Sequence, residues 1–196
     1  MRRRMIKCKD SEGGSIYRLS SPVIFDGSNN IDTGIHLYRD YDDFTFFTDI
    51  EFDTSEQVGS GNAMPTIVAC MYELNPWPGF AFRYDPSSYQ IEIVFGNSTA
   101  TKMRIAGSNR CKVCVSVKNK RCEGIYFKIG DNELRKMDEY DTSSQNNIDK
   151  AVLVLGSYRP PQGTYGRYWR GTIYDFAVYD RALSEEEING LFLLEG

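Results

Sequence analysis

The C-terminal segment carries the pattern that most constrains this fold, an extended run followed at once by a short capped helix. Residues 169–179 read Trp-Arg-Gly-Thr-Ile-Tyr-Asp-Phe-Ala-Val-Tyr. Phe176 and Val178 share one face of such a strand, because successive side chains point to opposite faces. Ile173 is out of phase with them, which predicts a β-bulge or burial on both faces. The segment therefore predicts a closing β-strand.

The helix that follows has strong local start signals. Ser184 and Glu187 have the spacing of a capping box, in which each side chain satisfies the other's free backbone N–H. Leu183 and Ile188 stand at the positions of a hydrophobic staple. Acidic residues in the first turn also favour the positive end of the helix dipole. We therefore interpret these acids as structural and not as a binding site.

The rest of the chain predicts many short strands. The 196 residues suit one domain, with an N-terminal extension over 1–20 and the domain over 21–196. The 13 Tyr, 11 Phe and 2 Trp favour strands, and the 17 Gly supply turns. Strands are expected within residues 15–19, 22–35, 44–52, 66–72, 79–84, 90–95, 112–117, 124–129, 152–155 and 172–179. The fold class is thus all-β, a two-sheet antiparallel β-sandwich of the jelly-roll type with a short C-terminal helix.

Two segments have a more specific expected structure. Phe44, Phe46, Ile50 and Phe52 alternate with polar residues, which predicts a half-buried strand. Residues 22–35 read as two short strands around a Gly/Asn turn, which is typical of a hairpin.

The closing strand and helix, Trp169 to Leu191, resemble the end of laminin G-like domains in the concanavalin A-like lectin/glucanase superfamily. The order of the preceding strands is similar to that family over residues 22–192. The resemblance implies a concanavalin A-like sandwich and a lectin-like role. It leaves the function open, because one fold serves many functions.

Composition excludes several partners. The net charge of −4 and the pI of about 5.1 argue against a nucleic-acid binder. No apolar run approaches about 18 residues, so we expect no membrane span. The basic N-terminus has no apolar stretch after it and does not resemble a secretory signal. We expect synthesis in the cytosol and a final location on a virion or the cell exterior.

The five cysteines are interpreted mostly as reduced, buried thiols. Cys111 and Cys114 form a CxxC, but they begin a strand-like run. Residues three apart on a strand face opposite sides, so this spacing opposes a zinc or redox site.

One carboxylate pattern is a catalytic candidate. Glu51, Asp53 and Glu56 fit the E-x-D-x-x-E pattern of a β-glucanase family in the same superfamily. By that resemblance Glu51 would be the nucleophile and Glu56 the acid/base, and a retaining pair needs carboxyls about 5–5.5 Å apart. The alternative is that these are solvent-facing carboxylates on a strand. We expect no enzymatic activity.

The resemblance to the concanavalin A-like superfamily implies structural calcium as the cofactor. Members of this superfamily hold Ca²⁺ at the sandwich edge with oxygen ligands, which this hard cation requires. Asp175 in the closing strand resembles an Asp used in this way, and Asp26 and Asp32 flank a turn that offers further oxygens. The alternative is that the 26–32 segment is a turn rich in turn-forming residues.

Two aromatic loops are the candidate ligand-binding region. Loops on a rigid sandwich commonly bind ligands, and aromatic rings stack on sugars or anchor protein interfaces. Trp169 is interpreted instead as a core residue that opens the closing strand. The expected binding residues are Tyr72, Trp77, Tyr158, Arg159, Tyr165, Arg167 and Tyr168.

The sequence therefore predicts a non-catalytic, lectin-like module that binds a glycan or cell-surface polymer. The alternative is a bacteriophage virion protein of a tail fibre or capsid, in contact with other virion proteins or with itself. A glycoside hydrolase is the third hypothesis.

Overall fold

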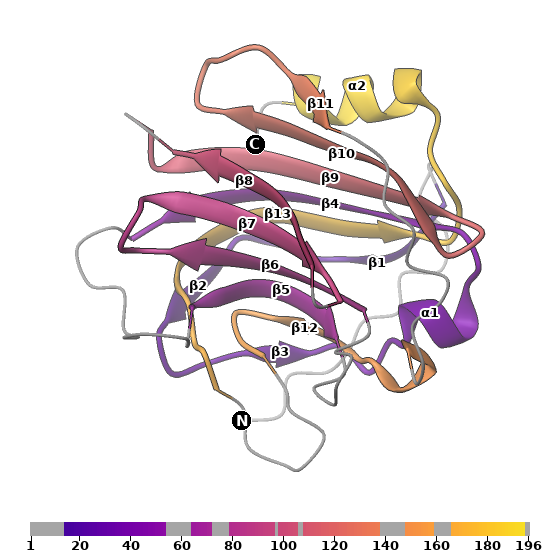
Figure 1. Cartoon of the computed structure of the whole chain (residues 1–196), viewed down its shortest axis with the longest axis horizontal. Helices are drawn as coiled ribbons and strands as arrows, with labels where there is room; N and C mark the ends of the chain where they lie inside the picture. The colour runs from indigo at the N-terminus through magenta and orange to yellow at the C-terminus, as the bar shows by residue number, and fades with distance from the viewer. Residues whose placement is uncertain are drawn as a thin grey trace.

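The computed structural model describes residues 14–53, 64–71, 79–96, 98–105, 108–137, 148–158 and 166–194. They form two antiparallel sheets packed face to face (Figure 1), which confirms the predicted sandwich. The first sheet has the order β1–β13–β4–β9–β10–β11, with β2 also paired to β13. The second has the order β3–β12–β5–β6–β7–β8.

The strands of the first sheet are β1 (Ser15–Arg18), β2 (Val23–Asp26), β4 (Phe44–Phe52), β9 (Arg110–Lys118), β10 (Arg121–Ile129), β11 (Arg135–Met137) and β13 (Arg170–Tyr179). Those of the second are β3 (Ile31–Asp32), β5 (Thr66–Met71), β6 (Gly79–Asp85), β7 (Gln90–Phe95), β8 (Ser98–Arg104) and β12 (Leu153–Leu155). The helical elements are α1 (Leu37–Asp40), η1 (Ile148–Lys150) and α2 (Glu185–Leu193).

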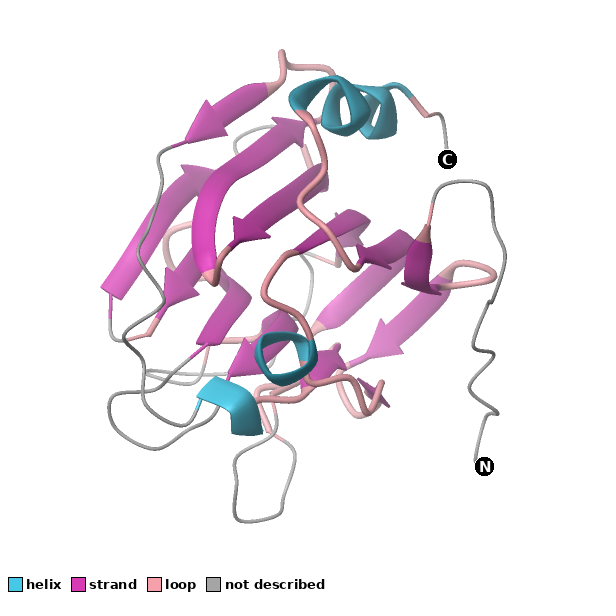
Figure 2. Cartoon of the chain, turned by 90° about the vertical axis from the view of Figure 1, so that its right-hand side faces the viewer, coloured by secondary structure: helices cyan, strands magenta, loops and turns pink. Residues whose placement is uncertain are grey.

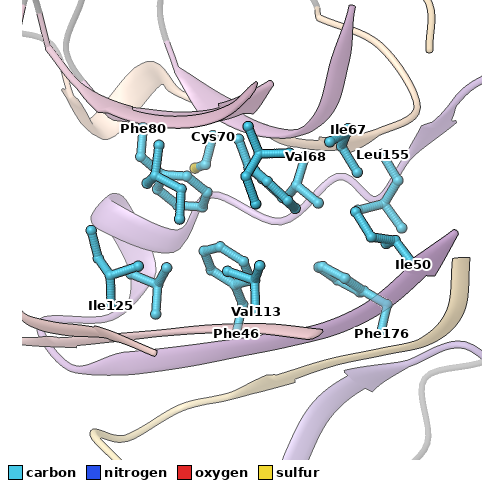
Figure 3. Close-up of a cluster of buried hydrophobic side chains, with 14 of the residues drawn as sticks. Phe46, Ile50, Ile67, Val68, Cys70, Phe80, Val113, Ile125, Leu155 and Phe176 are labelled. Carbon is cyan, nitrogen blue, oxygen red and sulfur yellow. The ribbon is translucent and has the colours of Figure 1, made fainter. Parts of the chain in front are cut away.

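The core lies between the two sheets (Figure 3). Phe46, Val113 and Phe176 project into it from the first sheet, and Val68 and Phe80 project from the second. The rings of Phe46 and Phe80 stack with centroids 4.9 Å apart across the interface. Offset aromatic stacking of this kind adds to the free energy gained from burial.

The closing strand β13 has a bulge, one of the two explanations that the sequence allowed for the phase of Ile173. Its register with β4 shifts between Ile173 and Asp175. Ile173 and Phe176 are both in the core, whereas Tyr174 and Asp175 both contact polar groups of the outer face. The extra residue therefore lets two neighbouring polar side chains share that face.

The prediction that β4 is half-buried was wrong, because both of its faces are covered. Phe47 lies on the outer face and is only 2% exposed. It packs with Ile188 and Phe192 of α2, and the rings of Phe47 and Phe192 are 5.7 Å apart. Figure 2 shows α2 lying against the outer side of this sheet.

The hairpin predicted within residues 22–35 was also wrong. β2 pairs with β13 in the first sheet, whereas β3 pairs with β12 in the second. The turn between them therefore carries the chain from one sheet to the other. β1, which lies inside the predicted extension 1–20, pairs with β13. The short helix α1 was not predicted from the sequence, and its Leu37 and Tyr38 are fully buried.

The capping box of α2 is confirmed. The Ser184 hydroxyl accepts from the Glu187 N–H at 3.3 Å, and the Glu187 carboxylate accepts from the Ser184 N–H at 2.9 Å. Leu183 and Ile188 are buried in one cluster, as the staple predicts. Arg181 also donates to both carboxylate oxygens of Glu187, at 2.8 and 2.6 Å.

Removing the Glu187 charge is expected to destabilise the protein only at pH values at which the Glu187 carboxylate is ionised. The Arg181 guanidinium lowers the pKa of Glu187 from 4.5 to about 2. The contribution is therefore complete above pH 4.5 and is lost as the pH falls toward about 2. Because the Glu187 side chain is 42% exposed, Glu187→Gln should cost under about 1 kcal/mol near neutral pH. Urea unfolding of the intact protein and of Glu187→Gln should show their difference in free energy of unfolding becoming smaller as the pH falls. A difference that does not change with pH would contradict this prediction.

Candidate functional site

Four polar side chains form a row across the outer face of the second sheet. Thr66, Arg83, Glu92 and Lys102 lie directly opposite one another on β5, β6, β7 and β8. The neighbouring residues Phe82, Tyr84, Ile91 and Ile93 face the core, so alternation places the row outside. A register shift after Thr66 lets its side chain join the row while Val68 points inward. We call these four residues the polar row.

The centre of the polar row is a buried carboxylate between two cations. The Glu92 side chain is 1% exposed, whereas those of Arg83 and Lys102 are 21% and 53% exposed. Arg83 places Nε at 3.1 Å and Nη2 at 3.0 Å from Glu92 Oε2. Lys102 Nζ lies 2.7 Å from Oε1. The buried Glu92 therefore fixes the positions of two cations, of which Lys102 is exposed and Arg83 is partly exposed.

A strained loop residue lies beside the polar row. The Arg167 carbonyl accepts a hydrogen bond from the Thr66 N–H at 2.8 Å. Its guanidinium lies 5.0 Å from the ring centre of Tyr158, in the range of a cation–π contact. Arg167 also has a φ of 56°, which is unfavourable for a side-chain-bearing residue. A strained backbone conformation of this kind persists only when the surrounding structure holds it in place. Such conformations also cluster at functional sites.

The arrangement is suited to binding an anion on a polar ligand. Arg83 directs Nε and Nη2 at one oxygen of Glu92. Its planar guanidinium has further N–H groups that can donate to a ligand. Arginine recognises carboxylates through two parallel hydrogen bonds, with more directional specificity than lysine. The site holds its cation in place before a ligand arrives, which lowers the entropy cost of binding.

The predicted aromatic residues fall partly within this region. Tyr158 is 3% exposed and packs with Ala69, Met71 and Ala81 on the outer face of the second sheet. Arg167 and Tyr168 are half-buried. Tyr72, Trp77, Arg159 and Tyr165 lie outside the described residues. Trp169 is fully buried in the core, as interpreted from the sequence.

Sequence reasoning missed Arg83, Glu92 and Lys102. The signal was present in the runs Phe-Ala-Phe-Arg-Tyr and Gln-Ile-Glu-Ile-Val-Phe, where a charge interrupts an apolar strand. A charged residue in a nearly continuous apolar strand needs a partner or a function.

One catalytic candidate, Glu51, lies on the outer face of the first sheet, between the core residues Ile50 and Phe52 of β4. Glu51 accepts hydrogen bonds from Tyr174 Oη at 2.6 Å and Asn109 Nδ2 at 2.9 Å. The bond to Glu51 raises the pKa of Tyr174. Asp53 is exposed, and Glu56 lies outside the described residues. The predicted pairing of Glu51 with Glu56 therefore remains a prediction.

A second carboxylate on that face is also paired. Arg110 donates to both oxygens of Asp49, at 3.0 and 2.8 Å, and stacks 4.7 Å from the ring centre of Tyr174. Lys112 lies 3.9 Å from Asp49 and donates to the Phe192 carbonyl at 3.4 Å. This network joins β4, β9 and β13 to the end of α2, which is a structural role.

The calcium candidates have other partners. Arg18 donates to both oxygens of Asp175, at 3.2 and 2.7 Å. Asp26 Oδ1 accepts from the N–H and hydroxyl of Ser28, and Asp32 Oδ1 accepts from the Gly34 N–H. Within the described part of the chain, no group of three or more His, Cys, Asp or Glu could hold a metal. Calcium binding remains a prediction, and an ion at Asp175 would have to displace Arg18.

The CxxC residues face opposite sides of β9, as their spacing predicts. Cys111 belongs to the core between the sheets, and Cys114 belongs to the cluster under α2. Burial raises the pKa of both thiols, which keeps them protonated and unreactive.

Comparisons with solved structures find the same fold in sialidases. The Ruminococcus gnavus IT-sialidase CBM40 superimposes with a TM-score of 0.64 at 14% identity, covering 91% of this chain and 99% of that chain. The leech intramolecular trans-sialidase matches with a TM-score of 0.63 at 17% identity, covering 93% of this chain. The Streptococcus pneumoniae NanB sialidase matches with a TM-score of 0.63 at 12% identity, covering 89% of this chain. This chain spans 28% of the length of each of those two enzymes.

At these identities the likeness establishes the fold alone, a two-sheet jelly-roll sandwich like that of the Ruminococcus gnavus module. No family model matches the chain, and no curated protein matches it. The laminin G-like assignment therefore remains a prediction. The sialidase neighbours give no support to the virion role. Among the described helices, none has the length and apolar character of a membrane span.

Proposed function

We propose that this protein is a non-catalytic carbohydrate-binding module that binds sialylated glycans through the polar row. The observation that carries the proposal is Arg83, an outward-facing cation held in place by a buried carboxylate. Sialic acid carries a carboxylate, a group that an arginine guanidinium can bind through two parallel hydrogen bonds.

The neighbouring residues supply the other contacts that such a ligand needs. Lys102 adds a second cation on the same row, and Arg167 adds a third on the adjacent loop. Glu92 is shared by two cations, so it neutralises only part of their charge. The local excess of positive charge attracts anionic ligands although the whole chain is acidic.

The fold neighbours favour the same ligand class. The Ruminococcus gnavus CBM40 has been solved bound to α2,3 sialyllactose and to α2,6 sialyllactose, with TM-scores of 0.64 and 0.62 to this chain. A separate module with this fold therefore binds sialylated glycans without the rest of its sialidase.

Hydrolysis is the weaker proposal. Glu51 is engaged by Tyr174 and Asn109, and Asp49 is engaged on both oxygens by Arg110. These contacts join neighbouring segments of the first sheet. We therefore assign no catalytic role to this face.

Isothermal titration with 3′-sialyllactose and with lactose tests the proposal. The intact protein should bind sialyllactose and not lactose, because only the former has the carboxylate. Arg83→Gln should weaken binding about 10- to 100-fold, which corresponds to loss of about 1.5–3 kcal/mol from a charge-assisted contact.

Arg121→Gln is the matched control. Arg121 is an exposed arginine at the start of β10 in the other sheet, and its replacement should leave the affinity unchanged. Equal affinity for the two sugars, or an unchanged affinity in Arg83→Gln, would exclude the polar row as the sialic acid site.

A further inference from the structure

A pocket of about 500 Å³ is lined by residues of the edge strand β8 and by residues of β10, β11 and the turn between them. Its apolar lining comprises Met103, Phe127, Ile129 and Met137. Its volume is in the range of small-molecule sites. The pocket therefore has room for a sugar-sized ligand.

Two arginines on opposite sheets line this pocket. Arg104 ends β8, and Arg135 begins β11. Arg135 lies opposite Phe127, whose side chain faces the interior, so Arg135 projects from the same face of its sheet. Both arginines are exposed, and neither forms an ion pair with any residue that the structure describes. Lys136 is different, because its Nζ lies 5.4 Å from the Tyr126 ring on the outer face.

The remaining polar lining fits a sugar. Asn132 and Glu133 contribute an amide and a carboxylate, which can donate to and accept from hydroxyl groups. The apolar side chains offer a surface for the C–H groups of a pyranose ring. Sites with an apolar lining and a few placed polar groups are typical of ligand pockets.

The pocket is continuous with the polar row. Lys102 lines the pocket and also binds Glu92 at 2.7 Å in the row. Arg104 lies two residues further along β8, on the same strand face as Lys102. Cationic side chains therefore lead from Arg83 over the edge strand to Arg135.

We propose that this pocket is a second subsite for another carboxylated sugar of the same chain, so that the protein prefers oligomeric acidic glycans to a single terminal residue. The inference rests on the proposed function, because the first sugar occupies the polar row. A ligand held at both positions gains affinity, since the second contact is intramolecular.

Titrations with a sialic acid series test the inference. The probes are the methyl glycoside of sialic acid and its α2,8-linked dimer and tetramer. In the intact protein, affinity should rise at least tenfold from the monomer to the tetramer. This exceeds the few-fold statistical gain expected because a tetramer offers several sialic acid residues to a single site. Arg104→Gln and Arg135→Gln should remove most of this rise and leave the monomer affinity unchanged. Arg121→Gln should behave as the intact protein.

The outcomes separate the two proposals. A monomer that binds with no gain at greater length overturns the second subsite and leaves the polar row intact. A gain that survives in both pocket variants also overturns it. Polyglutamate binding as tightly as the tetramer would show simple charge attraction and reject the subsite. If no probe binds, the proposed function fails as well.

Discussion

Gly171→Ala is expected to destabilise the protein by about 4 kcal/mol, the sum of overpacking and a forbidden backbone conformation. Gly171 has a φ of +151°, and a Cβ there would lie 2.3 Å from the Glu51 carbonyl oxygen of β4. It would also lie 2.3 Å from Cζ2 of Trp169. Because Gly171 pairs with both β2 and β4, neither neighbour can retreat without breaking the sheet. Urea unfolding followed by circular dichroism measures the loss.

Gly190→Ala is the matched control and should have the opposite sign. Gly190 is an exposed residue of α2 with nothing within 4 Å of the added Cβ. Alanine is favoured over glycine in a helix, so the free energy of unfolding should rise by about 0.5–1 kcal/mol. Equal effects of the two substitutions would contradict the close approach at Gly171.

Trp169→Ala is expected to cost about 3–5 kcal/mol, the usual cost of removing a large buried aromatic ring. The Trp169 side chain is fully buried, with its ring 5.8 Å from Phe25 and 6.0 Å from Phe52. These three rings connect β2, β4 and the entry to β13 at one end of the core. A cavity there removes contacts from three strands at once.

Measuring ligand affinity as well as stability distinguishes a core role of Trp169 from a role in binding. Under conditions where the variant remains folded, its affinity for 3′-sialyllactose should match that of the intact protein. Leu193→Ala, at a side chain that is 80% exposed, should change stability by under about 0.5 kcal/mol. A stable Trp169→Ala protein with weakened binding would place Trp169 in the site and not in the core.

Much of the fold could be predicted from local patterns. The alternation of Phe44, Phe46 and Ile50 predicted β4, and the phase change at Ile173 indicated either a bulge or burial on both faces, of which the structure has the bulge. The Ser184–Glu187 pair predicted the start of α2, because a capping box depends only on residues three apart. These features depend on short-range geometry, which a sequence contains.

The candidate site was harder to predict, because its members come from four strands. Arg83 and Glu92 are nine positions apart, and they meet only because β6 and β7 pair in one register. A shift of one residue would turn one of them toward the core. Their partnership therefore depends on pairing and not on either strand alone.

The sequence by itself determined most of the strands and the start of the capped helix α2, each set by contacts within a few residues, but it did not reveal α1. The tertiary structure alone decided which face of each strand remained open. It covered the outer face of β4 with α2, sent β2 and β3 to different sheets, and aligned the polar row across the second sheet. These outcomes depend on packing and register between distant segments, where burial of apolar surface outweighs local preference.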